Sequence, residues 1–355
     1  MKQSKRTPIA LAALTLVAVA MLFLMPTGVT NVQGAVDGDL FRIPDVAFDV
    51  RFTGIVVLTV MALATGLSAW FVLVKHHKTP RWVVLVFGLL FSLQILLDLY
   101  VGKTMTFTSL MQGSLALAVP LIFGSLAGVL SERVGVVNIA IESQLLIGAF
   151  ASAFAASLTQ NLFVGLLAAT IAGALVSFVL AVFAIKYVVD QIIVGVVLNV
   201  LIVGLTNFLF STLLGANTVL FNMPPRFEKL PIPGLAQIPV IGPVLFNQTL
   251  IVYLMYFAVA GVWFALFKTR WGLRVRAVGE YPKAADTVGI KVFRTRYISV
   301  IIGGAIAGLG GSFFTLGQVG AFGKEMTNGA GYIALAALIF GRWNPIYAAF
   351  AALLF

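Results

Sequence analysis

The sequence has no cysteine, and only 10% of its 355 residues are charged. The absence of cysteine excludes disulfides, thiolate metal sites and thiol redox chemistry. A soluble domain usually has about a quarter of its residues charged. Because this chain is 61% hydrophobic, one globular core could not hide its apolar surface. The shortage of charge therefore places most of the protein in lipid.

Catalytic motifs are missing as well. The chain has no His-Glu-x-x-His, no Gly-x-Ser-x-Gly and no paired-carboxylate motif. The nearest approach to a phosphate-binding loop is Gly102-Lys103-Thr104, but Leu97 stands where the first glycine of that motif belongs. His76 and His77 lie in a basic loop with no carboxylate or further histidine nearby. The sequence thus predicts no catalytic residue, no metal and no cofactor.

Long uncharged runs occupy most of the chain. Phe52–Val74 has 23 residues without a charge, about 34 Å of helix, which matches a hydrocarbon core of roughly 30 Å. The later runs are Trp82–Tyr100, Phe107–Leu130, Val134–Leu158, Leu162–Ile185, Ile192–Leu214, Leu250–Phe267, Tyr297–Leu316 and the region from Gly331 onward. The pattern predicts an all-α, polytopic transmembrane helical bundle with about ten membrane segments.

The first apolar run follows a basic head that contains Lys2, Lys5 and Arg6. Such a run is either a cleaved signal peptide or a first membrane helix. Because no small-residue cleavage site precedes the next segment, we predict an uncleaved helix over residues 9–26.

The net charge of +11 comes from basic residues that lie between the apolar runs. They are therefore interpreted as topology signals and not as a nucleic-acid surface. With the N-terminus in the cytoplasm and spans alternating, inside segments hold 16 of the 23 Lys and Arg residues and outside segments hold six, with Arg342 unassigned. This distribution places 268–296 in the cytoplasm and 222–243 outside.

The inside loop 268–296 has a stretch, Glu280–Ile290, with the composition of a short helix. Pro282 suits a first turn, and Gly289 suits the stop after the last turn. A short capped helix in the cytoplasm could contact a partner protein. A basic helix lying on anionic lipid is the alternative that the residues leave open.

Two sets of polar side chains fall inside apolar runs. Asn138 and Glu142 are four residues apart and are expected on one helix face, where Glu142 either lines a solute route or makes a structural hydrogen bond. Gln191, Gly195 and Asn199 also recur every four residues, and this stripe either faces an aqueous route or packs against a neighbour. The glycine-rich stretch 303–311 predicts close helix packing.

At these residues the sequence resembles the membrane permeases of bacterial ABC importers in the ribose and branched-chain amino-acid permease superfamily. It is most similar to purine-nucleoside permeases that work with a basic-membrane-lipoprotein-type receptor. The likeness covers about residues 107–355. The matching motifs are Ser131–Ser143 (Ser-Glu-Arg-x-Gly-Val-x-Asn-Ile-x-x-Glu, with Ser143 in place of a glycine), Asp190–Asn199, Thr269–Ile290 and Gly341–Pro345.

The resemblance implies a single permease domain over residues 1–355 in the bacterial plasma membrane. It also implies two ATP-binding subunits, a second permease that is homologous or identical, an extracellular solute-binding lipoprotein and membrane lipid as partners. Solute would pass along Asn138, Glu142, Gln191 and Asn199. The residues expected to couple to the ATPase are Arg274, Arg276, Glu280, Pro282, Ala284, Ala285, Asp286 and Gly289. Among them, Ala285 is expected to face the ATPase.

Family members continue beyond the position of Phe355, and the ten apolar residues of Ile346–Phe355 are too few to span. We therefore expect the chain to be incomplete at its C-terminus. Two alternatives to a nucleoside importer stay open. One is a permease for sugars or branched-chain amino acids. The other is a secondary transporter with Glu142 as its proton or sodium site, which would need no ATPase and gives no reason for the long basic loop.

Overall fold

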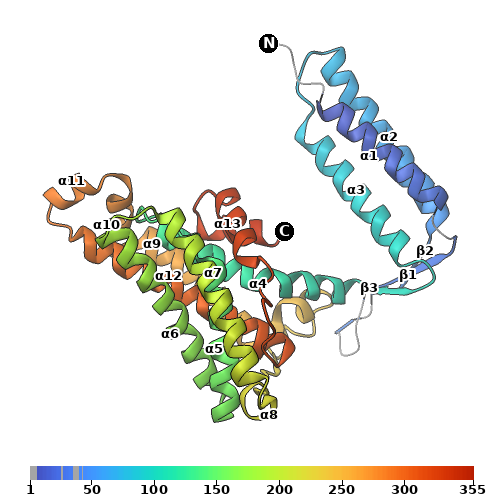
Figure 1. The fold of residues 1–355 in the computed structure, drawn as a ribbon. Coiled ribbons are helices and arrows are strands. Elements are labelled where there is room, and N and C mark those ends of the chain that lie inside the picture. Colours follow the sequence, from blue (N-terminus) through green and yellow to red (C-terminus); the bar gives the residue numbers. More distant parts are fainter. Residues whose placement is uncertain (1–5, 25–26, 35–39, 42) are drawn as a thin grey trace. The chain divides into compact units, whose positions relative to one another are not determined.

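The computed structural model describes residues 6–24, 27–34, 40–41 and 43–355 (Figure 1). Lys2 and Lys5 of the basic head, and the last two residues of the helix expected over 9–26, lie outside this range. The chain forms two compact units. One comprises Met1–Met111 with Pro233–Val244, and the other comprises Gln112–Ile232 with Leu245–Phe355. The boundary near residue 112 lies close to the start of the family-like core predicted over 107–355.

Nine helices of the described residues are long and apolar enough to cross a membrane, and two shorter apolar helices follow them. This arrangement confirms the predicted polytopic helical bundle. The nine are α1 (Arg6–Leu24), α2 (Val50–Leu73), α3 (Arg81–Leu99), α4 (Phe107–Glu132), α5 (Ile141–Thr159), α6 (Leu162–Ala181), α7 (Gln191–Leu209), α9 (Leu250–Lys268) and α12 (Val292–Ser312). The two shorter apolar helices are α13 (Ala330–Phe340) and α14 (Pro345–Ala352).

The remaining elements are short. Helices α8 (Thr218–Phe221), α10 (Arg270–Glu280) and α11 (Pro282–Thr287) lie in connections, and π-helical turns cover Val182–Lys186, Phe210–Leu214, Gly242–Phe246 and Phe313–Val319. Two small sheets were not anticipated from the sequence. Strand β1 (Val29–Gln33) pairs antiparallel with β2 (Val46–Asp49) and parallel with β3 (Thr104–Thr106). Strand β4 (Lys229–Pro231) pairs antiparallel with β5 (Asn247–Thr249).

In the first unit, α1 packs on α2 and α2 packs on α3. Their shared core includes Leu11, Ala18, Met61 and Phe87. Most other side chains of these helices are exposed in the isolated chain, as expected for helices whose outer faces contact lipid.

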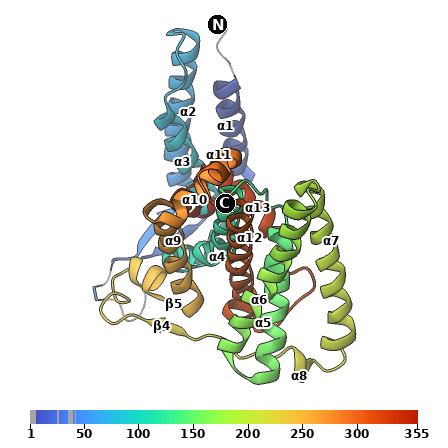
Figure 2. The same cartoon turned by 90° about the vertical axis from the view of Figure 1, so that its left-hand side faces the viewer.

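In the second unit, α4, α5 and α12 are the most buried spans, and α12 packs closely on α5 and α6 (Figure 2). Glycines make this approach possible. A Cβ at Gly308 would collide with the backbone of Ala169, and a Cβ at Gly311 would collide with the carbonyl of Leu145. The prediction that the stretch 303–311 serves close packing is therefore confirmed.

The run Val134–Leu158, expected as one helix, is interrupted at its start. Helix α4 ends at Glu132 and α5 begins only at Ile141. The intervening residues 133–140, here called the break, form turns and irregular backbone, with Gly135 at a φ of +83°. Asn138 lies in the break and Glu142 lies in the first turn of α5. The prediction that these two side chains share a helix face is therefore wrong.

The predicted loop 268–296 contains two helices, α10 and α11, before α12 begins at Val292. Helix α11 confirms the predicted short helix, with Pro282 at its first position and Gly289 just beyond its end at a φ of +83°. Helix α10 was not anticipated. The Thr269 hydroxyl caps it by accepting from Gly272 N at 3.1 Å.

Candidate functional site

Helix α7 holds the break in place through its polar stripe. Gln191 Oε1 accepts from Val137 N at 2.6 Å. One turn further along α7, a Cβ at Gly195 would lie only 2.9 Å from Ile139 Cβ. One turn further again, Asn199 Nδ2 donates to Ile139 O at 3.0 Å. All three residues of this stripe therefore contact the break.

Asn138 stabilises the break from within. Its side-chain amide exchanges two hydrogen bonds with that of Gln144, at 3.2 and 3.1 Å, and Asn138 Nδ2 also lies 3.4 Å from Ser131 Oγ. All three side chains are fully buried. Buried amides of this kind are costly unless paired, so the reciprocal bonds fix the course of the break between α4 and α5.

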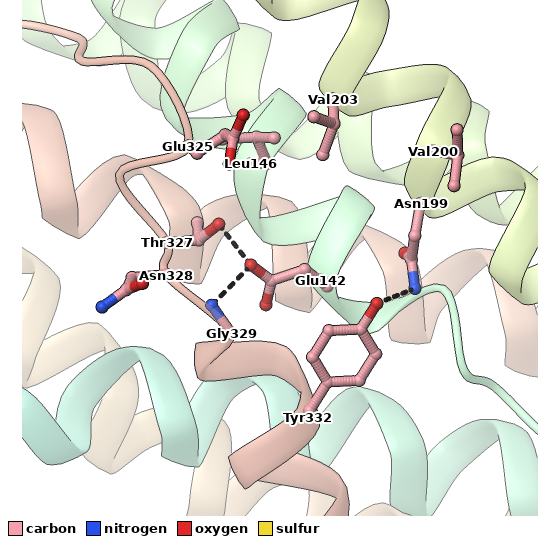
Figure 3. Close-up of a pocket in the computed structure, with 10 residues that line it drawn as sticks. All are labelled: Glu142, Leu146, Asn199, Val200, Val203, Glu325, Thr327, Asn328, Gly329 and Tyr332. Carbon is pink, nitrogen blue, oxygen red and sulfur yellow. Dashed lines mark hydrogen bonds between the residues drawn. The ribbon is translucent and has the colours of Figure 1, made fainter.

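Glu142 binds the residues at the start of α13 (Figure 3). Its Oε1 accepts from Thr327 Oγ1 at 2.6 Å and from Gly329 N at 3.0 Å, and its Oε2 accepts from Gly331 N at 2.6 Å. A carboxylate at a helix N-terminus satisfies backbone donors that lack a partner inside the helix and interacts favourably with the helix dipole. Glu142, which belongs to α5, thus caps α13.

Asn199 does the same for α5. Its Oδ1 accepts from Ser143 N, in the first turn of α5, at 3.0 Å, while its Nδ2 also donates to Tyr332 Oη at 3.1 Å. Two consecutive caps, each supplied by another helix, therefore link α7 to α5 and α5 to α13.

The C-terminal end of α13, opposite the end that Glu142 caps, contacts the junction of α4 and the break. There Trp343 Nε1 donates to Glu132 Oε2 at 2.5 Å, and Arg133 Nε donates to Trp343 O at 3.0 Å. The 11 residues of α13 rise about 16 Å, roughly half of a hydrocarbon core. The two ends of α13, one at Glu142 and the other at Glu132 and Arg133, are therefore separated by roughly half the thickness of a hydrocarbon core. Interrupted helices near the bilayer midplane mark solute sites in many transporters.

A pocket of about 320 Å³ opens beside the two caps (Figure 3). Of the four residues expected along the solute route, Glu142 and Asn199 line it. Asn138 and Gln191 do not line it: the Asn138 side chain is bonded to Gln144 and Ser131, and the Gln191 side chain is bonded to Val137 N in the break. The remaining lining residues are Leu146, Val200, Val203, Glu325, Thr327, Asn328, Gly329 and Tyr332.

The segment 325–332 supplies half of this lining, and the sequence reasoning missed it. Tyr332 is half exposed, and Glu325 Oε1 accepts from Asn207 Nδ2 at 3.0 Å. The available signals were weak: a charged pair at Lys324-Glu325 and the turn-forming dipeptide Asn328-Gly329. These features look like an ordinary loop unless the partner of Glu142 is known.

Of the residues expected to contact an ATPase, only Ala285 is buried. Ala285 is only 4% exposed and is buried against its own chain, so the expectation that it faces a partner is wrong. The exposed apolar side chains around α11 are Ala284 and the larger residues Tyr281 and Val288, which are 62% and 75% exposed. Overpacking at Ala285 would therefore disturb the hairpin of α10 and α11 itself.

The end of α10 lies directly on the break. A Cβ at Gly279 would collide with the carbonyl of Arg133, and the guanidinium groups of Arg133 and Arg276 lie 5.8 and 5.3 Å from the ring centre of Phe267. Burial lowers the pKa of Arg133, the adjacent Arg276 lowers this pKa further, and Glu280 raises it. Among the predicted coupling residues, Arg276 and Glu280 thus surround the start of the break.

Comparisons with known proteins agree with this architecture. A family model described as "Branched-chain amino acid transport system / permease component" matches residues 110–355. The chain is 45% identical over 255 residues to the guanosine ABC transporter permease protein NupQ of Bacillus subtilis, covering 68% of this chain and 78% of that protein. It is 40% identical over 243 residues to the nucleoside ABC transporter permease protein NupC of Lactococcus lactis, covering 66% and 76%.

A third relative is the putative glucose ABC transporter permease protein TsgC13 of Haloferax volcanii, which is 35% identical over 238 residues, covering 66% of this chain and 71% of that protein. No solved structure matches the chain. The matched region contains the break, both caps and the hairpin of α10 and α11. This multi-pass protein of the bacterial plasma membrane therefore belongs to the family of ABC transporter permease components.

Proposed function

We propose that the chain is the membrane-spanning subunit of an ATP-driven importer of nucleosides. The observation that carries this proposal is the 45% and 40% identity to permeases named for guanosine and for nucleosides. In this function, solute from an extracellular receptor enters a route between two permeases, and the route opens alternately to each side. ATP hydrolysis takes place on separate subunits.

The chemistry of the pocket supports a nucleoside as solute. Glu325 offers hydrogen-bond acceptors, Asn328 offers an amide, and the half-exposed Tyr332 offers a ring and a hydroxyl. Apolar lining from Leu146 and the valines of α7 suits the faces of a base. A volume of about 320 Å³ is at the lower end of the range for small-molecule sites, which suits a compact solute.

Uptake by the reconstituted system tests this function. The permease pair, the ATPases and the receptor are placed in proteoliposomes, and ATP-dependent entry of radiolabelled guanosine is measured. We expect labelled guanosine to accumulate. Excess unlabelled nucleoside should suppress this accumulation, and excess glucose should not. The reverse competition would favour the sugar-permease alternative, which the likeness to TsgC13 raises. Gradient-driven uptake in the absence of ATPase would instead favour a secondary transporter.

We further propose that the hairpin of α10 and α11 contacts the ATPase. Tyr281, Ala284 and Val288 support this role, because they expose apolar surface on a loop that the distribution of basic residues predicts to be cytoplasmic. The end of α10 lies on the break, so a movement of the hairpin would act on the segment that leads to Glu142.

The variant Val288→Asp tests this contact. Burial of a valine in an interface stabilises it by roughly 1.5–3 kcal/mol, so the exchange should lower recovery of the co-purified ATPase at least tenfold. Lys283→Gln is the matched control, because an exposed charge on the same short helix contributes less than about 1 kcal/mol. Undiminished recovery of the ATPase with Val288→Asp would refute the contact.

A further inference from the structure

A basic pocket of about 820 Å³ lies between α10 and the start of α12. Its cations are Arg270 and Arg274 from α10, Lys291 just before α12, and Arg294 in the first turn of α12. None of its 11 lining residues is acidic. Four positive charges around one cavity, without a carboxylate among them, create a site for a group with concentrated negative charge, such as a phosphate.

An apolar groove of about 550 Å³ adjoins this pocket, and Trp271 lines both. The groove runs between α9, where Gly261 and Ala265 line it, and α12, where Ile302 and Ile306 line it. A Cβ at Gly261 would meet no atom within 4 Å, so this side of the groove is open.

The two cavities share one face of α12. Ile298 lines the basic pocket, and Ile302 and Ile306 line the groove at intervals of four residues. From Ile298 to Ile306 the helix rises about 12 Å. The line of these residues runs from the basic end of α12 toward the interior of the span. A molecule occupying both cavities must therefore have an anionic head and an apolar tail of at least this length.

We propose that the basic pocket and the groove together bind one anionic phospholipid, with its phosphate among the cations and one acyl chain along α12. A soluble phosphate would use only the basic pocket and would leave the groove empty. An ATPase on the cytoplasmic side would not reach a groove that runs along membrane spans. Trp271 lines both cavities where they meet, and tryptophan is a residue that prefers the polar edge of a bilayer.

The expected preference follows from the number of cations. Each Lys or Arg near the membrane surface adds roughly 1 kcal/mol to the binding of anionic lipid, or about a fivefold change in affinity. Removal of two of the four cations should therefore lower the preference for an anionic over a zwitterionic lipid by roughly 30-fold. Arg270 and Arg294 are suitable for this change, since Arg274 also belongs to the predicted ATPase contact.

The experiment is native mass spectrometry of the purified transporter released from nanodiscs with equal amounts of phosphatidylglycerol and phosphatidylcholine. The unmodified protein should retain phosphatidylglycerol selectively, and the double variant Arg270→Gln with Arg294→Gln should lose that selectivity. Arg51→Gln with Lys103→Gln is the matched control, because these exposed cations lie at other span ends. The variant Gly261→Phe, which fills the groove, should release the lipid without a change in the basic pocket.

Several outcomes would overturn the proposal. Equal retention of both lipids by the unmodified protein, or unchanged selectivity in the Arg270 and Arg294 variant, would exclude an anionic-lipid site. Displacement of the lipid by millimolar inorganic phosphate, with no effect of Gly261→Phe, would identify a free-anion site instead. Loss of the ATPase from the double variant with unchanged lipid retention would assign the basic pocket to the protein contact. None of these measurements depends on which solute the protein transports.

Discussion

Replacement of Glu142 by glutamine should loosen the segment 325–331 and lower transport. The carboxylate of Glu142 accepts three hydrogen bonds, from Thr327 Oγ1, Gly329 N and Gly331 N. Glutamine has one acceptor oxygen, so its amide nitrogen would face at least one of these donors. A buried donor that loses its partner costs about 1–3 kcal/mol, and a hydrogen bond to a charged group contributes about 1.5–3 kcal/mol. A local loss of about 2 kcal/mol corresponds to a roughly 30-fold rise in the open population of the segment.

The rate of thiol labelling measures this opening, because the chain has no cysteine of its own. Thr327 is only 3% exposed, so a cysteine introduced there should react slowly in the parent and much faster beside Glu142→Gln. Thr327→Cys removes the hydroxyl that donates to Glu142, so the labelling rate of Met326→Cys is measured as well. Glu325→Gln is the matched control for the labelling rate alone, because this exposed carboxylate accepts from Asn207 and not from the residues that Glu142 caps. Equal labelling rates and equal uptake in Glu142→Gln and the parent would refute the capping role.

Three further predictions concern topology and packing. In intact cells an impermeant reagent should label Glu228→Cys and not Lys283→Cys, and labelling at 283 would contradict the orientation derived from the basic residues. Asn199→Ala should remove the partner of the buried Ser143 N, at about 1–3 kcal/mol, and that of the partly buried Ile139 O. Thermal stability in detergent should therefore fall more than with Ser211→Ala, whose hydroxyl bonds only its own helix. Gly308→Ala should prevent assembly, judged by gel filtration, because its Cβ would collide with the backbone of Ala169, whereas Gly204→Ala should be tolerated because nothing lies within 4 Å.

The membrane spans could be predicted because their signal is local. A run such as Phe52–Val74 has the length and composition that lipid requires, and the structure contains α2 (Val50–Leu73) there. Helix α11 was also predictable, since Pro282 and Gly289 delimit it through backbone preferences of their own.

The break could not be predicted because hydropathy does not distinguish an apolar helix from apolar irregular backbone. Val134, Val136 and Ala140 are as hydrophobic as residues of any span, yet they are not helical. What permits the interruption is a set of distant side chains. Gln191 and Asn199 bond the backbone of Val137 and Ile139, and non-helical backbone at membrane depth survives only where protein groups satisfy it.

The same distinction separates the two kinds of helix cap in this chain. Asp190 and Asn344 cap the helices that they immediately precede, α7 and α14, and such caps follow from the sequence alone. Glu142 of α5 caps α13, and Asn199 of α7 caps α5, so each of these caps comes from a different helix. A local cap stabilises one helix and leaves its neighbours free to move, whereas a cap from another helix adds its energy only while the two helices keep their relative position. An opening of the pocket that separates α13 from α5 must therefore break the bonds of Glu142 first. We therefore propose that the Glu142 carboxylate influences when solute can pass, even though hydrogen bonds within its own chain occupy most of its acceptor capacity.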